Sequence, residues 1–317
     1  ICHYLIGVCV AQCVIAILID NYPIVKEQVH RIVSTGFLNA ADLEEKNRLY
    51  GIGCALDVAG TRFAAVLTMI AALIVKHKGA NLYRLYAYMA SFVIIGVIGN
   101  MIARTTSVGV MLAIVYWLVS AYPYSFTINR SSTGILKHVL ILSAVTLPII
   151  ISLYNNNPAV REDIRFAFEG FFSLAEKGEW DVSSNDRLMN MYVFPDNAKT
   201  WIIGDGYFDG PSNTDPYYVG PTMTGFYMWT DVGYLRFIFY FGLIGLAAFL
   251  FFFIKCGQVC AHKFRNYALL FWLLMLLNFI IWFKVSTDIF VVFALFLSIP
   301  QEDNDAYENS LSDPLDI

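Results

Sequence analysis

Charged side chains are scarce in this chain, and their scarcity limits the class of protein to which it can belong. Asp, Glu, Lys and Arg make up 15% of the 317 residues, whereas soluble domains usually contain about one quarter. The formal net charge of -4 also lacks the basic excess with which nucleic-acid-binding proteins contact phosphates. Hydrophobic residues make up 58% of the chain. The composition therefore predicts an integral membrane protein with no nucleic-acid partner.

The chain also lacks the spacings of a disulfide framework, a metal site or a nucleotide site. Its six cysteines are scattered through apolar segments, at Cys2, Cys9, Cys13, Cys54, Cys256 and Cys260. Its five histidines show no metal-ligand spacing: His3, His30, His77, His138 and His262. We found no nucleotide-binding glycine motif and no internal repeat. We therefore expect no metal, no cofactor and no energy from ATP.

Long apolar runs are present, and they predict an all-α, polytopic bundle of transmembrane helices. A bilayer core about 30 Å thick requires about 20 apolar residues in a helix. On that criterion we expect eight spans: Ile1–Ile19, Arg62–Val75, Leu85–Ala103, Val108–Tyr122, Leu136–Tyr154, Val232–Ile254, Tyr267–Phe283 and Val285–Ile299. The last two could instead form a re-entrant hairpin. Because the sequence starts at Ile1 inside an apolar run, we expect further helices upstream.

Basic residues in three short connections predict the orientation, because such loops are retained in the cytoplasm. These residues are Lys76, Lys78 and Arg84, then Arg130 and Lys137, then Lys255, Lys263 and Arg265. The predicted organisation is an N-terminal set of helices, 1–154, with a periplasmic loop 20–61, a large periplasmic loop 155–231, C-terminal helices 232–299 and an acidic cytoplasmic tail 300–317. The predicted location is the bacterial inner membrane. The many aromatic residues of 155–231 indicate a partly folded loop rather than a disordered one.

Five arginines fall on the predicted outer face: Arg48, Arg62, Arg104, Arg187 and Arg236. Placing an arginine within or beside the membrane costs free energy, so each such arginine is a candidate functional residue. Its planar guanidinium matches phosphate oxygens in a bidentate manner, so several together suit a pyrophosphate. The alternative is that each arginine extends to the lipid headgroups or pairs with Asp57, Asp186 or Asp231.

Four segments carry a resemblance to a known family. They are Arg48-Leu-Tyr-Gly51 with Leu56-Asp-Val-Ala-Gly60; Ile102-Ala-Arg104-Thr-Thr-Ser107-Val-Gly109; Ser184-Asn-Asp-Arg187 with Gly204-Asp-Gly206; and Thr230-Asp231-Val-Gly-Tyr-Leu235 running into Gly242-Leu-Ile-Gly245. In this order they resemble the O-antigen polymerase (Wzy-type) and O-antigen ligase superfamily of membrane proteins. Ligases of this group generally carry a histidine where this chain has Asp231, which favours the polymerases.

The resemblance implies a membrane-embedded glycosyltransferase that builds an O-antigen or capsular-type polysaccharide. Glycan would pass from its undecaprenyl pyrophosphate carrier to a lipid-linked repeat unit, with a further partner that regulates chain length. The implied catalytic residues are Asp231 as general base, Arg187 and Arg104. The implied pyrophosphate-binding residues are Arg48, Arg104, Arg187 and Arg236. Asp231 could instead cap the helix that follows it, because Asp is a favoured N-cap residue.

Two other functions stay open. A ligase of the same superfamily would deliver finished glycan to another acceptor. A polysaccharide-lipid flippase or transporter belongs to a different class, in which inverted repeats and helices broken by Gly or Pro are common. The best sequence feature for transport is the group formed by Asn278, Lys284 and Asp288, although Lys284 and Asp288 could simply pair with each other across one helical turn.

Overall fold

The computed structural model describes residues 1–32, 49–77, 82–121, 144, 147–213, 215–223 and 225–299. The regular secondary structure of these ranges is helical, so the all-α prediction is confirmed. Arg48, most of the predicted span Leu136–Tyr154 and the tail 300–317 lie outside the described residues. Residues 147–156, at the end of that predicted span, are helical.

Four helices of the described ranges are long and apolar enough to cross a membrane: α1 (Cys2–Asn21), α4 (Leu56–Val75), α5 (Leu82–Ile102) and α12 (Gly233–Lys263). Two apolar helices are shorter, α6 (Thr106–Ala121) and α13 (Ala268–Ile281). The eight residues of α14 (Phe290–Leu297) span only about 12 Å, too little for a bilayer core. The structure therefore favours the hairpin alternative for the last two predicted spans.

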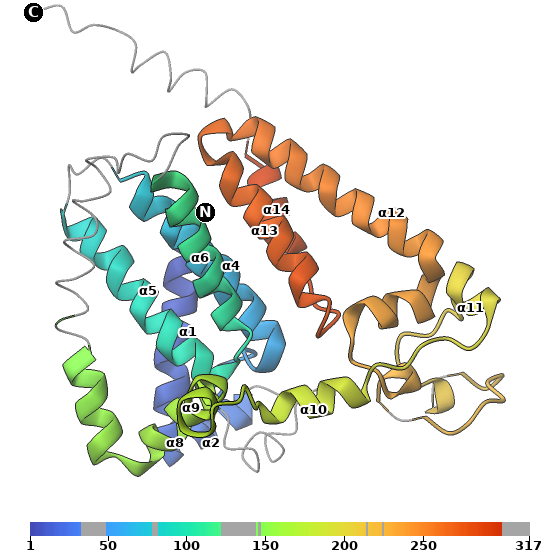
Figure 1. Cartoon of the computed structure of the whole chain (residues 1–317), viewed down its shortest axis with the longest axis horizontal. Helices are drawn as coiled ribbons and strands as arrows, with labels where there is room; N and C mark the ends of the chain where they lie inside the picture. The colour runs from blue at the N-terminus through green and yellow to red at the C-terminus, as the bar shows by residue number, and fades with distance from the viewer. Residues whose placement is uncertain are drawn as a thin grey trace, which may run out of the picture.

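The helices form two groups that meet at α13 (Figure 1). Helices α1, α4, α5 and α6 pack together, and α12, α13 and α14 form the second group, in which α13 contacts both α4 and α6. Helix α4 lies at the centre of the first group. Its small residues allow close approach: a Cβ atom added to Gly109 of α6 would lie 2.3 Å from the Cα atom of Ala64. Small residues at such crossings are typical of helix pairs in membranes.

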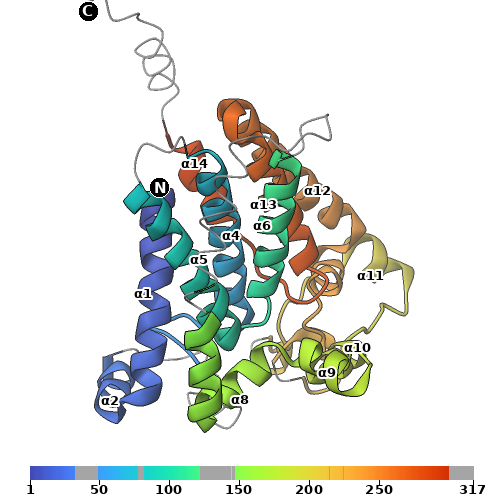
Figure 2. The same ribbon diagram turned by 60° about the vertical axis from the view of Figure 1, so that its left-hand side comes forward.

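The ends of the helices sort into two sets (Figure 2). Helix α2 (Pro23–Ile32) and helices α8 (Pro158–Ala167), α9 (Glu169–Lys177) and α10 (Ser183–Asn190) gather at one end of the bundle. The C-terminal ends of α4 and α12, which carry Lys76 and Lys263, lie at the opposite end. The basic-residue topology requires this separation. Which end faces the cytoplasm stays a prediction.

The long segment 155–231 is folded, in agreement with its aromatic content. It contains α8, α9, α10, α11 (Ala198–Ile203) and two 3-10 helices, Pro211–Asn213 and Tyr227–Trp229. It is tied to the second helix group, because the Tyr192 hydroxyl donates to the Phe283 carbonyl at 2.9 Å. Met223 and Tyr227 are buried in the same core as α12 and α13.

Helix α12 is interrupted at Gly242, whose φ of 66° and ψ of -174° are not helical. The interruption leaves carbonyl groups of α12 without donors from the helix itself. The loop after α11 supplies other donors. The Asp205 amide donates to the Phe239 carbonyl at 2.6 Å, and the Gly206 amide donates to the Tyr240 carbonyl at 3.1 Å. The loop thus satisfies the backbone groups that the break frees, as a helix in lipid would require. The broken helix is one feature of transporters that the sequence did not reveal.

A carboxylate of α8 predicts a measurable pH dependence of stability. Burial, then the nearby charges of Asp20 and Glu162, raise the pKa of Asp163 to about 6. Because the pKa of Asp163 is raised in the folded protein, the stability that this group contributes is fully present below about pH 4. That contribution is lost as the pH rises through about 6. We expect Asp163→Asn to raise the melting temperature at pH 7.5 by about 2–4 °C and at pH 5 by roughly half as much, because the pH is then midway between the two pKa values.

The control for this prediction is Glu179→Gln, which changes an exposed carboxylate on the connection between α9 and α10. Differential scanning fluorimetry of both variants at the two pH values measures the effect. Equal melting temperatures for Asp163→Asn and the unmodified protein at pH 7.5 would show that the carboxylate carries no cost.

Candidate functional site

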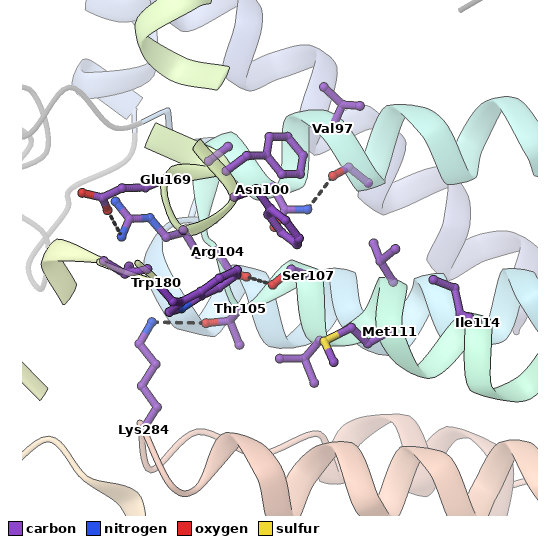
Figure 3. A pocket seen from close by; sticks show the side chains of 18 of the residues that line it. Val97, Asn100, Arg104, Thr105, Ser107, Met111, Ile114, Glu169, Trp180 and Lys284 are labelled. Atoms are coloured by element: carbon purple, nitrogen blue, oxygen red, sulfur yellow. Dashed lines mark hydrogen bonds and ion pairs between the residues drawn. The ribbon is translucent and has the colours of Figure 1, made fainter. Parts of the chain in front are cut away.

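A cavity of about 720 Å³ lies between α5 and α6 and extends beneath α9 and α10 to the end of α13. One end of it is polar and the rest is apolar, as Figure 3 shows. The polar lining residues include Asn100, Arg104, Thr105, Ser107, Glu169, Asn185 and Lys284. The apolar wall includes Phe92, Val97, Met111, Ile114, Leu147 and Ile150. A cavity of this kind suits a ligand with a charged head and a hydrocarbon chain.

Arg104 stands at the polar end, on the connection between α5 and α6. The turn is fixed by two side chains, because Thr106 Oγ1 donates to the Gly99 carbonyl at 2.9 Å and Ser107 Oγ donates to the Arg104 carbonyl at 2.6 Å. The guanidinium lies over the Phe166 ring, 4.0 Å from its centroid, and Nε donates to the Phe166 carbonyl at 2.9 Å. Nη1 is 2.6 Å from Oε2 of Glu169. The side chain is therefore oriented from two sides.

Lys284 brings a second cation to the same end from the connection between α13 and α14. Its Nζ atom lies 2.7 Å from Oδ1 of Asp57 and 3.5 Å from Oγ1 of Thr105, the residue next to Arg104. The connection is held by Trp282, which is fully buried and donates from Nε1 to the Thr287 carbonyl at 2.9 Å. The two cations thus come from segments far apart in sequence.

Asn100 adds a hydrogen-bond acceptor to the lining. Its side chain is 1% exposed, and its amide nitrogen donates to the Gly96 carbonyl at 2.6 Å. Its Oδ1 atom is buried and has no hydrogen-bond partner among the described residues. An unsatisfied buried acceptor costs free energy of about 1–3 kcal/mol, so a hydroxyl donor from a ligand or water would be stabilised there.

Arg236 and Asp231, both predicted as site residues, do not line this cavity. Arg236 is buried between two rings, with its guanidinium 3.8 Å from the centroid of Phe208 and 4.1 Å from that of Phe226. It pairs with Asp209 at 2.8 Å and with Asp231 at 3.8 Å. Arg236 therefore fits the ion-pair alternative, with Asp231 as one of its partners.

The alternative role of Asp231 as a helix cap is wrong. The N-cap residue of α12 is Val232, one position later, and the helix begins at Gly233. The Val232 amide donates instead to Thr230 Oγ1 at 3.3 Å. Asp231 is linked toward the cavity through Arg236, because Arg236 Nη1 also donates to Ser286 Oγ at 3.0 Å, and Ser286 lies two residues after the lining residue Lys284.

The other predicted arginines have different outcomes. Arg48 lies outside the described residues. Arg187 belongs to α10, and nothing is described of its side chain, but Asn185 and Leu188 on either side of it line the cavity. The convergence of Arg48, Arg104 and Arg187 on one cavity therefore stays a prediction. Of the three, the structure describes only the side chain of Arg104, which lines this cavity.

No family model, curated protein or solved structure matches this chain.

No group of three or more His, Cys, Asp or Glu side chains in the described part of the chain could hold a metal ion. Among the side chains that the structure describes, the charged groups that line the cavity are two cations and one carboxylate, Arg104, Lys284 and Glu169. Such a set can bind a phosphorylated headgroup and stabilise negative charge that develops on it.

Lys284 is the site residue whose role sequence reasoning missed. Its pairing with Asp288 is not what the structure shows, because the ammonium pairs with Asp57 and Asp288 Oδ1 accepts from the Phe290 amide at 2.8 Å. The available signal was a lysine between two apolar runs. Its partner lies 227 positions away, so no local pattern could identify it.

Proposed function

We propose that this chain is a membrane-embedded glycosyltransferase that polymerises an O-antigen or capsular-type polysaccharide from undecaprenyl-pyrophosphate-linked repeat units. The observation that carries the proposal is the two-ended cavity, with Arg104 and Lys284 at its polar end and an apolar wall along α5 and α6. The polar end accommodates the pyrophosphate, and the apolar wall contacts the first part of the polyprenyl chain. The sequence resemblance supplies the reaction.

The chemistry required of the site is stabilisation of a leaving group. Transfer breaks the bond between the first sugar of the growing glycan and the pyrophosphate, and negative charge then develops on the pyrophosphate. A preorganised donor at such a position typically contributes about 3 kcal/mol of barrier lowering. Arg104 is preorganised by Phe166, whose carbonyl accepts from Nε and whose ring lies against the guanidinium. Asn100 Oδ1 would accept a hydrogen bond from a hydroxyl of the substrate.

The acceptor hydroxyl must lose a proton, and the resemblance assigns this step to Asp231. Its neighbour Arg236 is linked through Ser286 to the connection that carries Lys284. A base at Asp231 therefore requires the substrate to extend from the cavity along that connection. The carboxylate of Glu169 lines the cavity directly. If Glu169→Gln were inactive and Asp231→Asn were active, Glu169 would be the base instead of Asp231.

The break of α12 at Gly242 is the observation that bears on the transporter alternative. Broken helices of transporters usually expose their free backbone groups to a substrate or ion. In this chain the free carbonyls of Phe239 and Tyr240 accept from the loop after α11, and neither residue lines the cavity. The break therefore anchors a loop, which supports an enzyme more than a carrier.

The products that accumulate without the protein test the proposal. In cells that carry a deletion, we expect glycan shortened to single repeat units that still reach their final acceptor, as seen by gel electrophoresis of the surface polysaccharide. Loss of a ligase would instead leave long polymer on the lipid carrier, and loss of a flippase would hold single units on the cytoplasmic leaflet. Either of those outcomes, or a polymer of normal length, contradicts polymerase function.

A further inference from the structure

Both cations of the cavity are paired with carboxylates of the protein itself. Arg104 pairs with Glu169 at 2.6 Å, and Lys284 pairs with Asp57 at 2.7 Å. None of the four side chains is fully buried, with exposures of 15%, 32%, 35% and 21% in that order. Because all four side chains remain within reach of solvent, a ligand with a higher charge density can enter and replace one partner of each pair.

Each carboxylate has a second hydrogen-bond donor that would remain after its cation left. Glu169 Oε2 also accepts from Ser183, from Oγ at 3.0 Å and from the amide at 3.3 Å. Asp57 Oδ1 also accepts from Thr105 Oγ1. Removal of the cations would therefore leave neither carboxylate without a partner, and this lowers the cost of an exchange.

The two pairs are adjacent. Arg104 and Thr105 are consecutive residues, and Lys284 Nζ lies 3.5 Å from Thr105 Oγ1 (Figure 3). Their cations nevertheless come from different helix groups, Arg104 from the α5–α6 connection and Lys284 from the α13–α14 connection. A monophosphate has one phosphoryl group to offer, whereas a diphosphate has two, joined at a fixed short distance.

We propose that Arg104 and Lys284 form a two-cation diphosphate site that Glu169 and Asp57 occupy until the ligand exchanges with them. One phosphoryl group replaces Glu169 on Arg104, and the other replaces Asp57 on Lys284. Lys284 is then the residue that selects a diphosphate over a monophosphate. The inference deepens the proposed function, on which it rests for the identity of the natural ligand, and it adds Lys284, Asp57 and Glu169 to the site.

Binding of short probes to the purified full-length chain in nanodiscs tests the exchange. The probes are farnesyl diphosphate and farnesyl monophosphate, titrated by calorimetry against the unmodified protein and four variants. Glu169→Gln and Asp57→Asn each remove a competing charge, so each should tighten diphosphate binding about three- to tenfold. Asp57→Asn/Lys284→Met removes the cation without leaving a repelling carboxylate. It should weaken diphosphate binding about tenfold or more relative to Asp57→Asn, and monophosphate binding by less than about threefold.

The fourth variant, Glu176→Gln, is the matched control, because Glu176 pairs with Arg165 at 2.7 Å and does not line the cavity. It should leave both affinities unchanged. Thermal melting identifies variants that fail to fold, and in that event Lys284→Arg replaces the double variant and should retain the preference for diphosphate. Unchanged affinity in Glu169→Gln and Asp57→Asn, or equal loss of both probes in the double variant, would overturn the exchange.

Failure of this inference is distinguishable from failure of the proposed function. If the probes follow the expected pattern while deletion leaves polymer of normal length, the site stands and the polymerase assignment is wrong. If deletion shortens the glycan to single units while the carboxylate variants bind diphosphate no more tightly, the polymerase stands and the exchange is wrong.

Discussion

Replacement of Arg104 by alanine is expected to reduce polymer synthesis by at least about 100-fold, because the loss of one preorganised donor to a developing oxyanion typically costs 10²–10³ in rate. Arg104 lies at the polar end of the cavity and is oriented by the Phe166 carbonyl and ring and by Glu169. The measurement is the length distribution of the surface polysaccharide in a deletion strain that expresses the variant at the level of the unmodified protein.

Two further variants separate a chemical role of Arg104 from a structural one. Arg104→Lys retains the positive charge but loses the planar fork, so we expect it to restore no more than about a tenth of the polymer. Arg165→Ala removes an arginine whose pairing with Glu176 is exposed and outside the cavity, and it should restore the full ladder. A full ladder from Arg104→Ala would exclude this residue from the reaction.

The helices of this chain could be predicted from sequence mainly because apolar runs are long. The predicted ends of the helices were less accurate. The predicted span began at Arg62, whereas helix α4 begins at Leu56. Its first turns include the polar residues Asp57 and Thr61, and the Thr61 hydroxyl donates to the Asp57 carbonyl. Helix α12 continues to Lys263 instead of Ile254. A hydropathy criterion detects the part of a helix that suits lipid and not the polar turns that extend it.

The candidate site was predictable only in part. Arg104 could be identified because an arginine inside an apolar run is costly and demands a reason. Arg236 was expected in the site on the same ground, but its surroundings are different, because Phe208, Phe226 and Asp209 enclose its guanidinium. Those contacts join residues 10 to 28 positions apart across a loop of irregular structure, and no periodicity encodes them. Sequence thus indicated costly cations without distinguishing a ligand site from a structural ion pair.

A second large effect is expected from Gly242→Ala, which should prevent accumulation of folded protein. The φ of 66° and ψ of -174° at Gly242 belong to a region that is essentially restricted to glycine. A Cβ atom there would also lie 2.2 Å from the carbonyl oxygen of Ile202 and 2.4 Å from the Ile203 amide nitrogen. Both partners are backbone atoms, so no side-chain rotation relieves the clash.

We expect Gly242→Ala to cost about 3 kcal/mol or more, the range of changes that combine backbone strain with overpacking. Fluorescence size-exclusion chromatography of a fusion protein measures the folded fraction. The matched control is Gly7→Ala in α1, where a Cβ atom meets nothing within 4 Å and should be neutral or slightly stabilising. A Gly242→Ala variant that elutes and melts like the control would show that α12 does not require this break.

Gly204 lies on the other side of the same contact between α12 and the end of α11, and its substitution should have a similar effect. Its φ is 77° with ψ -179°, and a Cβ atom on it would lie 2.6 Å from the Phe241 amide nitrogen and from the Tyr240 carbonyl carbon and oxygen. Either substitution alone forces the loop after α11 away from α12 and removes the hydrogen bonds that the Asp205 and Gly206 amides donate to the broken helix. Once the first substitution has separated the two segments, the second has less to disrupt. We therefore expect Gly204→Ala/Gly242→Ala to cost clearly less than the sum of the single variants, with a coupling of about 1 kcal/mol or more. Additive costs in a double-mutant cycle of melting measurements would mean that the two glycines are required for separate reasons.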